Sequence, residues 1–167
     1  RCGSIDPAIV PFLMKKEGLS PDQMNELMNK KCGFLGITEF SSDSRDLEEA
    51  SALHDNEERF ERATLATSVM AYQVQKYIGS YTAAMNGLDA LVFTAGLGEN
   101  NPKLRERVCS NMGFFGVEID REINDRTLRQ PNIVELSTKN SRVRVFVIPT
   151  NEELVIASDT EAIVKKL

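Results

Sequence analysis

The chain has 167 residues, 41% of them apolar, and its 20 basic and 25 acidic side chains give a net charge of −5. This length and composition predict one globular domain with a sizeable core, and the lack of a basic cluster argues against nucleic acid as a partner. No run approaches the roughly 18 apolar residues of a membrane span, and the N-terminus has no signal-peptide pattern, so we expect a soluble, cytoplasmic protein without membrane contact. Cys2, Cys32 and Cys109 are odd in number and widely separated, which predicts free buried thiols rather than disulfides or a zinc site.

Two helices are predicted at the start of the chain. Asp6 and Pro7 read as an N-cap followed by proline at the first helical position, and Gly18 ends the apolar stripe that follows. Ser20 then begins a second helix with a capping-box pattern, because Gln23 stands three residues later. The two helices should form a compact hairpin.

A charged cluster follows this hairpin, which closes at Gly33. Residues 34–42 lack a regular pattern, and Asp43, Ser44 and Arg45 stand at a predicted helix start. Clustered charges of both signs at such a junction are typical of a solvated helix cap.

A long amphipathic helix is predicted from Asp55, where Asp55 and Glu58 form a cap-like pair. Apolar residues then recur at spacings of three and four, namely Phe60, Ala63, Ala66, Met70, Val74, Tyr77, Tyr81 and Ala84. We expect this stripe to be the main core helix, with a break or kink near Gly79 and a stop at Gly87. His54, the only histidine, is expected at the surface.

The most informative stretch comes next, where a buried-strand pattern at residues 91–94 runs into a glycine turn. Gly96 and Gly98 can adopt positive φ and let a ligand approach the backbone, while Asn101 and Pro102 form a helix start whose N–H groups attract phosphate. The pattern predicts a nucleotide phosphate loop, with a generic tight turn as the alternative. It lacks the third glycine of a dinucleotide fingerprint and the lysine of a Walker loop.

The remaining elements are, in order, a helix with Leu104, Val108 and Met112 on one face that ends at Gly113, an apolar segment at 114–119, a polar segment at 120–130, an edge strand at 132–136, a strand at 143–149 and a helix at 154–164. Residues 91–112 and 143–164 are thus two strand–loop–helix units. Parallel strands place such loops at one carboxyl edge of a sheet, where α/β proteins bind ligands. The pairs Glu99-Asn100 and Asn151-Glu152 should therefore line one cleft.

Two glutamates in the second loop can be distinguished by their positions. If Thr150 is the N-cap, Glu153 falls at the third helical position and completes a capping box. Glu152 has no such role, and a carboxylate facing a phosphate cleft suits Mg²⁺ between the two. Glu152 is therefore the magnesium candidate, with a plain interaction with the helix dipole as the alternative.

Four motifs stand in order along the chain: RCGSIDP at 1–7, DSR at 43–45, FTAGLGEN at 93–100 and IPTNEEL at 148–154. Together they closely resemble the C-terminal part of the acetokinase family, within the actin, sugar kinase and Hsp70 superfamily. The resemblance covers essentially the whole chain. It implies an α/β fold, the C-terminal part of an actin-like ATPase (ribonuclease H-like) domain, helix-rich with a small sheet, and makes residues 1–167 a single partial domain.

The resemblance also implies roles for individual residues. Arg1 matches the arginine that stabilises the transition state of phosphoryl transfer, and Glu152 matches the magnesium ligand. The matching nucleotide-contacting positions are Asp43, Ser44 and Arg45 on the adenine and ribose side, and Gly96, Leu97, Gly98, Glu99 and Asn100 in the phosphate loop. Ser4 and Ser44 depart from the family pattern, which usually has aspartate and methionine there.

The implied activity is Mg²⁺-dependent phosphoryl transfer between ATP and acetate, giving acetyl phosphate and ADP, by an enzyme that is a homodimer at full length. A propionate or butyrate kinase, and a non-catalytic module that binds nucleotide or a partner, are the alternatives. The chain begins at Arg1 rather than methionine, and the family's acyl pocket, catalytic aspartate, histidine and second arginine have no counterpart. We therefore expect a part of a longer protein that is inactive alone.

Overall fold

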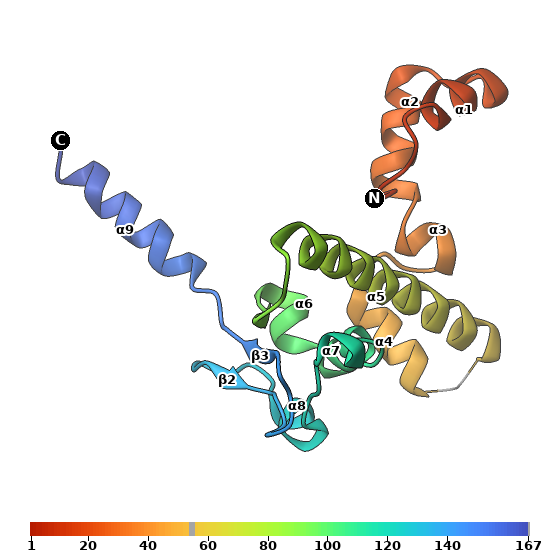
Figure 1. Ribbon diagram of the computed structural model, residues 1–167. Coiled ribbons are helices and arrows are strands. Elements are labelled where there is room, and N and C mark those ends of the chain that lie inside the picture. Colours follow the sequence, from red (N-terminus) through yellow and green to blue (C-terminus); the bar gives the residue numbers. More distant parts are fainter. Residues whose placement is uncertain (54–55, 167) are drawn as a thin grey trace. The chain divides into compact units, whose positions relative to one another are not determined.

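The computed structural model describes residues 1–53 and 56–166, which form two compact units (Figure 1). The first unit is Arg1–Met70, and the second begins at Ala71. The expected surface position of His54 and the cap at Asp55 lie outside the described residues. The expectation of a single domain stays a prediction.

The first unit is helical. Its elements are α1 (Ile9–Glu17), α2 (Pro21–Glu26), the π-helical turn η1 (Leu27–Lys31), α3 (Phe34–Thr38), α4 (Ser44–Leu53) and the first part of α5 (Glu57–Met85). The segment expected to be irregular therefore contains the short helix α3. This error arose because five residues are too few to show a helical period.

The hairpin of α1 and α2 is held by the local signals that predicted it. Gly18 ends α1 in the left-handed conformation at φ 66°. The Ser20 hydroxyl accepts a hydrogen bond from the Gln23 N–H at 3.3 Å, and the Gln23 side chain accepts one from the Ser20 N–H at 2.8 Å, so the capping box is confirmed. The Asp6 carboxylate accepts a hydrogen bond from the N–H of Ala8, and α1 begins only at Ile9. Asp6 therefore caps the turn before the helix and not the helix itself.

The core of the first unit lies between α4 and α5. Leu47 and Ala50 of α4 pack with Ala63 and Ala66 of α5, and all four are buried. Phe34, Ile37 and Phe40 pack against this cluster from one side. The predicted helix start at Asp43 to Arg45 is confirmed, because α4 begins at Ser44.

Helix α5 is continuous through Gly79, so the predicted break is wrong. The prediction of a core stripe is confirmed at Ala63 and Ala66 but is wrong at Tyr77 and Tyr81, which are 47% and 60% exposed. In this half of the helix the covered face carries polar residues, because Gln75 donates hydrogen bonds to the carbonyls of Arg107 and Val108 at 2.9 and 3.0 Å. Apolar periodicity could not identify a face of that kind.

Two local features end α5 close to the predicted stop. Asn86 takes a positive φ of 60°, and the N–H of Gly87 donates to the carbonyl of Thr82. Although α5 has 29 residues, neither it nor any other described helix is apolar enough over a sufficient length to cross a membrane.

The second unit adds a three-stranded sheet to a set of short helices. Its further elements are β1 (Ala90–Phe93), α6 (Ala95–Asn100), α7 (Pro102–Cys109), the 3₁₀ turn η2 (Gly113–Phe115), α8 (Arg121–Arg126), β2 (Val134–Glu135), β3 (Arg144–Val147) and α9 (Glu152–Val164). The strand order is β1-β3-β2, in which β1 pairs parallel to β3 and β2 pairs antiparallel to it. The small sheet, the edge strand and the α/β class are confirmed.

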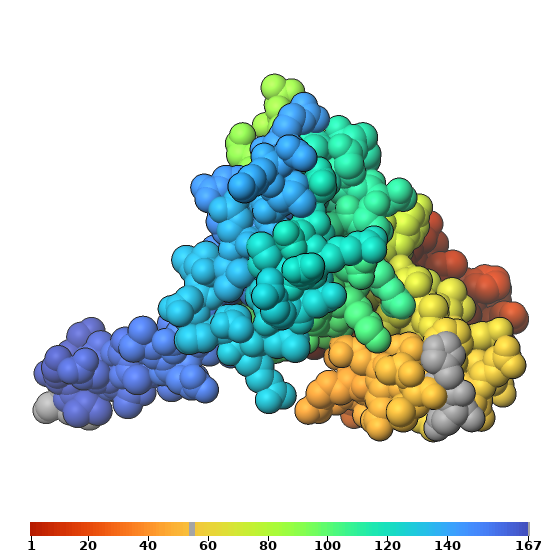
Figure 2. Space-filling view, turned by 90° about the horizontal axis from the view of Figure 1, so that it is seen from below, coloured from red at the N-terminus to blue at the C-terminus, as the bar shows by residue number. Residues whose placement is uncertain are grey.

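The sheet and α7 share the core of the second unit. Val145 and Val147 of the central strand are buried, as is the predicted face of Leu104, Val108 and Met112. Helix α7 stops at Cys109, four residues before the predicted end at Gly113. The thiol of Cys109 is buried as expected, whereas Cys2 and Cys32 are half-buried, and all three are free. Every residue of α9 is exposed. The helix is part of the blue C-terminal segment in Figure 2.

Candidate functional site

The two predicted loops meet at the carboxyl edge of the parallel strand pair. The N–H of Ile148 donates to the carbonyl of Phe93 at 2.9 Å, which extends the pairing of β1 and β3 to the point where both loops begin. Beyond it, the Glu99 carboxylate accepts hydrogen bonds from the N–H and the hydroxyl of Thr150 at 2.8 and 2.9 Å. The expectation that both loops share one edge is confirmed.

A hollow of 530 Å³ lies where these loops meet. Its walls are Glu99 and Asn100 from the first loop, Arg129, Gln130 and Pro131 from the segment after α8, and Pro149, Thr150, Asn151 and Glu153 from the second loop. The volume falls within the range of about 300–1,000 Å³ that is usual for small-molecule sites. The hollow therefore has room for part of a nucleotide, and its walls carry charges of both signs.

The glycines of the first loop act differently from the prediction. Residues 95–100 form the short helix α6, and the residue with positive φ is Ala95, at 57°, rather than Gly96 or Gly98. A Cβ on Gly98 would lie 3.1 Å from the carbonyl carbon of Phe93, while one on Gly96 would meet no atom within 4 Å. Gly98 is thus needed for close packing of α6 on the end of β1, and Gly96 presents open backbone.

The helix start at Asn101 and Pro102 is confirmed, and one of its N–H groups is already bound within the chain. The Asn101 side chain accepts a hydrogen bond from the Leu104 N–H at 2.8 Å, and both residues are buried. Because α6 precedes α7, the backbone that follows the strand and faces solvent is that of residues 95–100.

The capping assignment in the second loop is also corrected. Asn151, not Thr150, caps α9, since its side chain accepts from the Leu154 N–H at 3.0 Å. Glu152 and Glu153 are therefore the first and second helical residues, and the argument that Glu153 completes a capping box was wrong. Glu153 lines the hollow, whereas Glu152 does not.

One residue that holds the first loop in place was not predicted from the sequence. Arg105 on α7 is fully buried, and its guanidinium donates to the carbonyls of Gly98 and Glu99 at 2.8 and 3.0 Å. It also bonds α8 through Asn124 and reaches the carbonyl of Thr127. Burial lowers the pKa of Arg105. An arginine among the apolar residues of α7 could have indicated a buried polar contact. Its partners, however, lie in residues 120–130, which were predicted only as a polar segment.

Arg1 lies in the first unit, where the chain packs on the turn that closes the hairpin. The N–H of Cys2 donates to the carbonyl of Met28 at 2.8 Å. A Cβ on Gly33 would lie within 2.4 Å of the Arg1 carbonyl oxygen, so a glycine without a side chain is required there. Arg1 itself is exposed, and its catalytic role stays a prediction.

Asp43, Ser44 and Arg45 form the solvated cap that the charge pattern suggested. The Asp43 carboxylate accepts from the Arg45 N–H at 2.9 Å and pairs with its guanidinium at 2.6 Å. The Arg45 hydrogen bonds hold the pKa of Asp43 at about 2, below its ordinary 3.8. The expected contact of these residues with a nucleotide stays a prediction.

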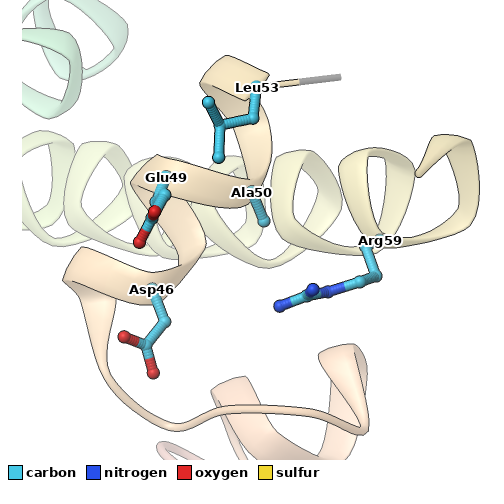
Figure 3. A pocket seen from close by; sticks show the side chains of 5 residues that line it. All are labelled: Asp46, Glu49, Ala50, Leu53 and Arg59. Carbon is cyan, nitrogen blue, oxygen red and sulfur yellow. The ribbon is translucent and has the colours of Figure 1, made fainter. Parts of the chain in front are cut away.

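A second, smaller hollow of 190 Å³ lies between α4 and the start of α5 (Figure 3). It is lined by Asp46, Glu49, Ala50, Leu53 and Arg59. The Arg59 guanidinium lies 4.6 Å from the centre of the Phe40 ring, and Asp46 accepts a hydrogen bond from the Ser41 hydroxyl. The hollow is smaller than the usual range for small-molecule sites.

Within residues 1–53 and 56–166, no three histidine, cysteine, aspartate or glutamate side chains are grouped so that they could hold a metal ion. A magnesium ion bound through one or two carboxylates and the phosphates of a substrate does not need such a group. Glu153 lines the hollow, and the other carboxylate in its wall, Glu99, already accepts two hydrogen bonds from Thr150.

Two strand–loop–helix units whose loops line a hollow at the carboxyl edge of parallel strands are an arrangement typical of the ligand sites of α/β proteins. The chain belongs to the acetokinase family, whose model matches residues 1–158. It is 52% identical to an acetate kinase of Halothermothrix orenii over 165 residues, which cover 99% of this chain and 39% of that enzyme. The chain therefore spans about two fifths of the relatives it matches.

Solved structures agree with this assignment. The acetate kinase of Porphyromonas gingivalis is 44% identical with a TM-score of 0.84, and the match covers 98% of this chain and 39% of that one. A propionate kinase of Francisella tularensis is 35% identical with a TM-score of 0.80, over 94% of this chain and 38% of its own.

Proposed function

We propose that this chain is the C-terminal, nucleotide-binding part of an acetate kinase. The single observation that carries the proposal is the 530 Å³ hollow formed where loops 95–100 and 149–153 meet at the carboxyl edge of β1 and β3. The relatives named acetate kinase, at 50% identity or more across nearly the whole chain, support the reaction class. The enzyme would be a cytoplasmic homodimer at full length.

The proposed reaction is in-line phosphoryl transfer. A carboxylate oxygen of acetate forms a bond to the γ-phosphorus of ATP as the bond from that phosphorus to the bridging oxygen breaks, which gives acetyl phosphate and ADP. Such a transition state needs positioning and charge neutralisation more than covalent chemistry from the protein.

The proposed roles of the residues follow the two loops and the first unit. The backbone of Gly96 to Asn100 would receive the phosphates, and Arg129 in the wall would neutralise part of their charge. Glu152 would hold Mg²⁺, which supplies further neutralisation when bound. Arg1 would stabilise the transition state, and Asp43, Ser44 and Arg45 would contact the adenine and ribose.

A propionate kinase is the second candidate, because the Francisella tularensis propionate kinase shares this fold at 35% identity. Residues that select the acyl group lie outside the matched segment in this proposal, so a butyrate kinase stays a third possibility of the same class. A non-catalytic module that binds nucleotide or a partner is the alternative of another class.

The test is an acyl phosphate assay on the full-length protein with MgATP and equal concentrations of acetate, propionate and butyrate, in which hydroxylamine traps the product. The proposal expects the highest kcat/KM for acetate, and no product from residues 1–167 alone. A preference for propionate or butyrate would replace the substrate. Binding of MgATP without any acyl phosphate would instead show a non-catalytic module.

A further inference from the structure

Arg105 connects two segments that contribute to the walls of the hollow, α6 and the chain after α8. Its side chain is fully buried, and all five guanidinium N–H donors have an acceptor among the described residues. One amino group bonds the carbonyls of Gly98 and Glu99, at 2.8 and 3.0 Å. The other bonds the carbonyls of Asn124 and Thr127, at 2.9 and 2.7 Å, and Nε bonds the Asn124 side chain at 2.8 Å.

The acceptors belong to two segments far apart in sequence. Gly98 and Glu99 lie in the last turn of α6, inside the proposed phosphate loop. Asn124 and Thr127 lie at the end of α8, just before the wall residue Arg129. A separate hydrogen bond supports the same junction, because the Asn100 side chain accepts from the N–H of Arg129 at 3.2 Å.

A buried arginine is a costly way to join two segments if stability alone is needed. The hydrogen-bond acceptors of Arg105 are carbonyl and amide oxygens rather than carboxylates, although the charge of Asp125 favours the ionised guanidinium. Replacing a buried charge by apolar residues of similar volume is often neutral or stabilising. A planar fork with five donors, however, fixes the relative position and angle of its acceptors in a way that apolar packing does not.

We propose that Arg105 is a positioning residue that fixes the phosphate loop, residues 95–100, against the wall segment, residues 127–131, and so sets the width of the hollow for the phosphates of a nucleotide. The inference rests on the proposed function where it names the ligand. Arg105 does not face the hollow and touches no substrate. It acts through the carbonyls that it holds.

The Arg105→Lys variant distinguishes a loss of local positioning from a general loss of stability. Lysine keeps the charge but offers three donors from one atom, so it cannot join both segments in the same geometry. We expect the rate of amide hydrogen exchange to rise about tenfold in both residues 95–100 and residues 124–130, with little change in β3. In the full-length enzyme the Kd for MgATP should rise about tenfold while KM for acetate changes less than about twofold, since only one substrate meets this loop.

Two further variants keep the test informative. Arg121→Lys is the matched control, because Arg121 lies in the same unit and pairs with Glu106 at 3.1 Å while 79% of its side chain is exposed. It should leave exchange and affinity unchanged. Asn124→Ala removes one acceptor and keeps the arginine, so it should show the same pattern at a smaller size if Arg105→Lys does not fold.

The hydrogen-exchange data test whether Arg105 holds the two segments together, and the affinity data test whether the ligand is a nucleotide. Faster exchange in both segments with weaker MgATP binding supports the whole inference. If exchange is faster in both segments but the parent protein does not bind nucleotide, the proposed ligand is wrong, while the role of Arg105 in holding the two segments together is supported. Exchange that rises equally throughout the second unit, or an MgATP affinity equal to the parent's, would show that Arg105 is merely structural.

Discussion

The carboxylate of Glu99 accepts hydrogen bonds from both the backbone N–H and the hydroxyl of Thr150, 51 residues further along the chain. This contact ties the loop after β1 to the loop after β3. In the structure the Glu99 carboxylate holds the two loops together, and the expected contact of Glu99 with a nucleotide stays a prediction.

The first prediction concerns this tie. Thr150→Val removes the hydroxyl and keeps the N–H, so one of the two hydrogen bonds is lost. A hydrogen bond to a charged group contributes about 1.5–3 kcal/mol when buried, and this exposed one should contribute about 1 kcal/mol or less. We expect a small fall in the free energy of unfolding and a several-fold weaker affinity for MgATP, measured by calorimetry. Thr160→Val on the exposed helix α9 is the control, and an equal loss of affinity there would refute the role of the tie.

The second prediction uses the two glycines of α6 as a matched pair. A Cβ at Gly98 meets the backbone of Phe93 at 3.1 Å, so Gly98→Ala should destabilise the second unit by about 1–3 kcal/mol. A Cβ at Gly96 meets nothing within 4 Å, so Gly96→Ala should be neutral or stabilise the short helix by about 0.5–1 kcal/mol. Urea unfolding of both variants measures the difference. Equal destabilisation by the two would mean that α6 does not pack on β1 as described.

The third prediction concerns the cap of α4. The hydrogen bonds from Arg45 lower the pKa of Asp43 to about 2, so the ionised carboxylate is favoured in the folded state. The associated stability is present above the unfolded pKa near 3.8 and is lost as the pH falls through about 2. An NMR titration should place the Asp43 midpoint near 2, and Arg45→Gln should move it toward 3.8. A midpoint near 3.8 in the parent would contradict the pairing.

The fourth prediction separates the two glutamates of α9. If Glu152 holds the metal, Glu152→Gln should raise the Mg²⁺ concentration needed for half-maximal rate in the full-length enzyme at least several-fold, and Glu153→Gln should raise it less. Glu153 lines the hollow and Glu152 does not, so the two variants compare the residue matched by the family resemblance with the residue placed at the hollow. The opposite order of effects would assign the metal to Glu153.

Sequence patterns predicted what local interactions determine. The capping box of Ser20 and Gln23 and the cap at Asn101 depend on residues three positions apart, and both are present as predicted. The parallel pairing of the two strand–loop–helix units also followed, because a helical crossover constrains its strands to be parallel.

The errors came from interactions that no local pattern records. The covered face of the second half of α5 includes Gln75, whose partners are two carbonyls of α7, and so the apolar pattern pointed to Tyr77 and Tyr81 instead. Thr150 resembled an N-cap, yet its hydroxyl donates a hydrogen bond to Glu99, and Asn151 is the residue that caps α9. Arg105 could not be interpreted because its acceptors in α8 lie 19 to 22 residues away.

The central claim is that the hollow at the carboxyl edge of β1 and β3 receives the phosphates of a magnesium-bound nucleotide. The most direct measurement is an NMR titration of isotopically labelled protein with millimolar MgATP, with MgCl₂ alone as the control. The account predicts that amide shifts change in residues 95–100, 129–130 and 150–153, and that the Arg105→Lys variant responds only at higher concentrations. Saturable shifts confined to other residues, or no shifts at all, would contradict it.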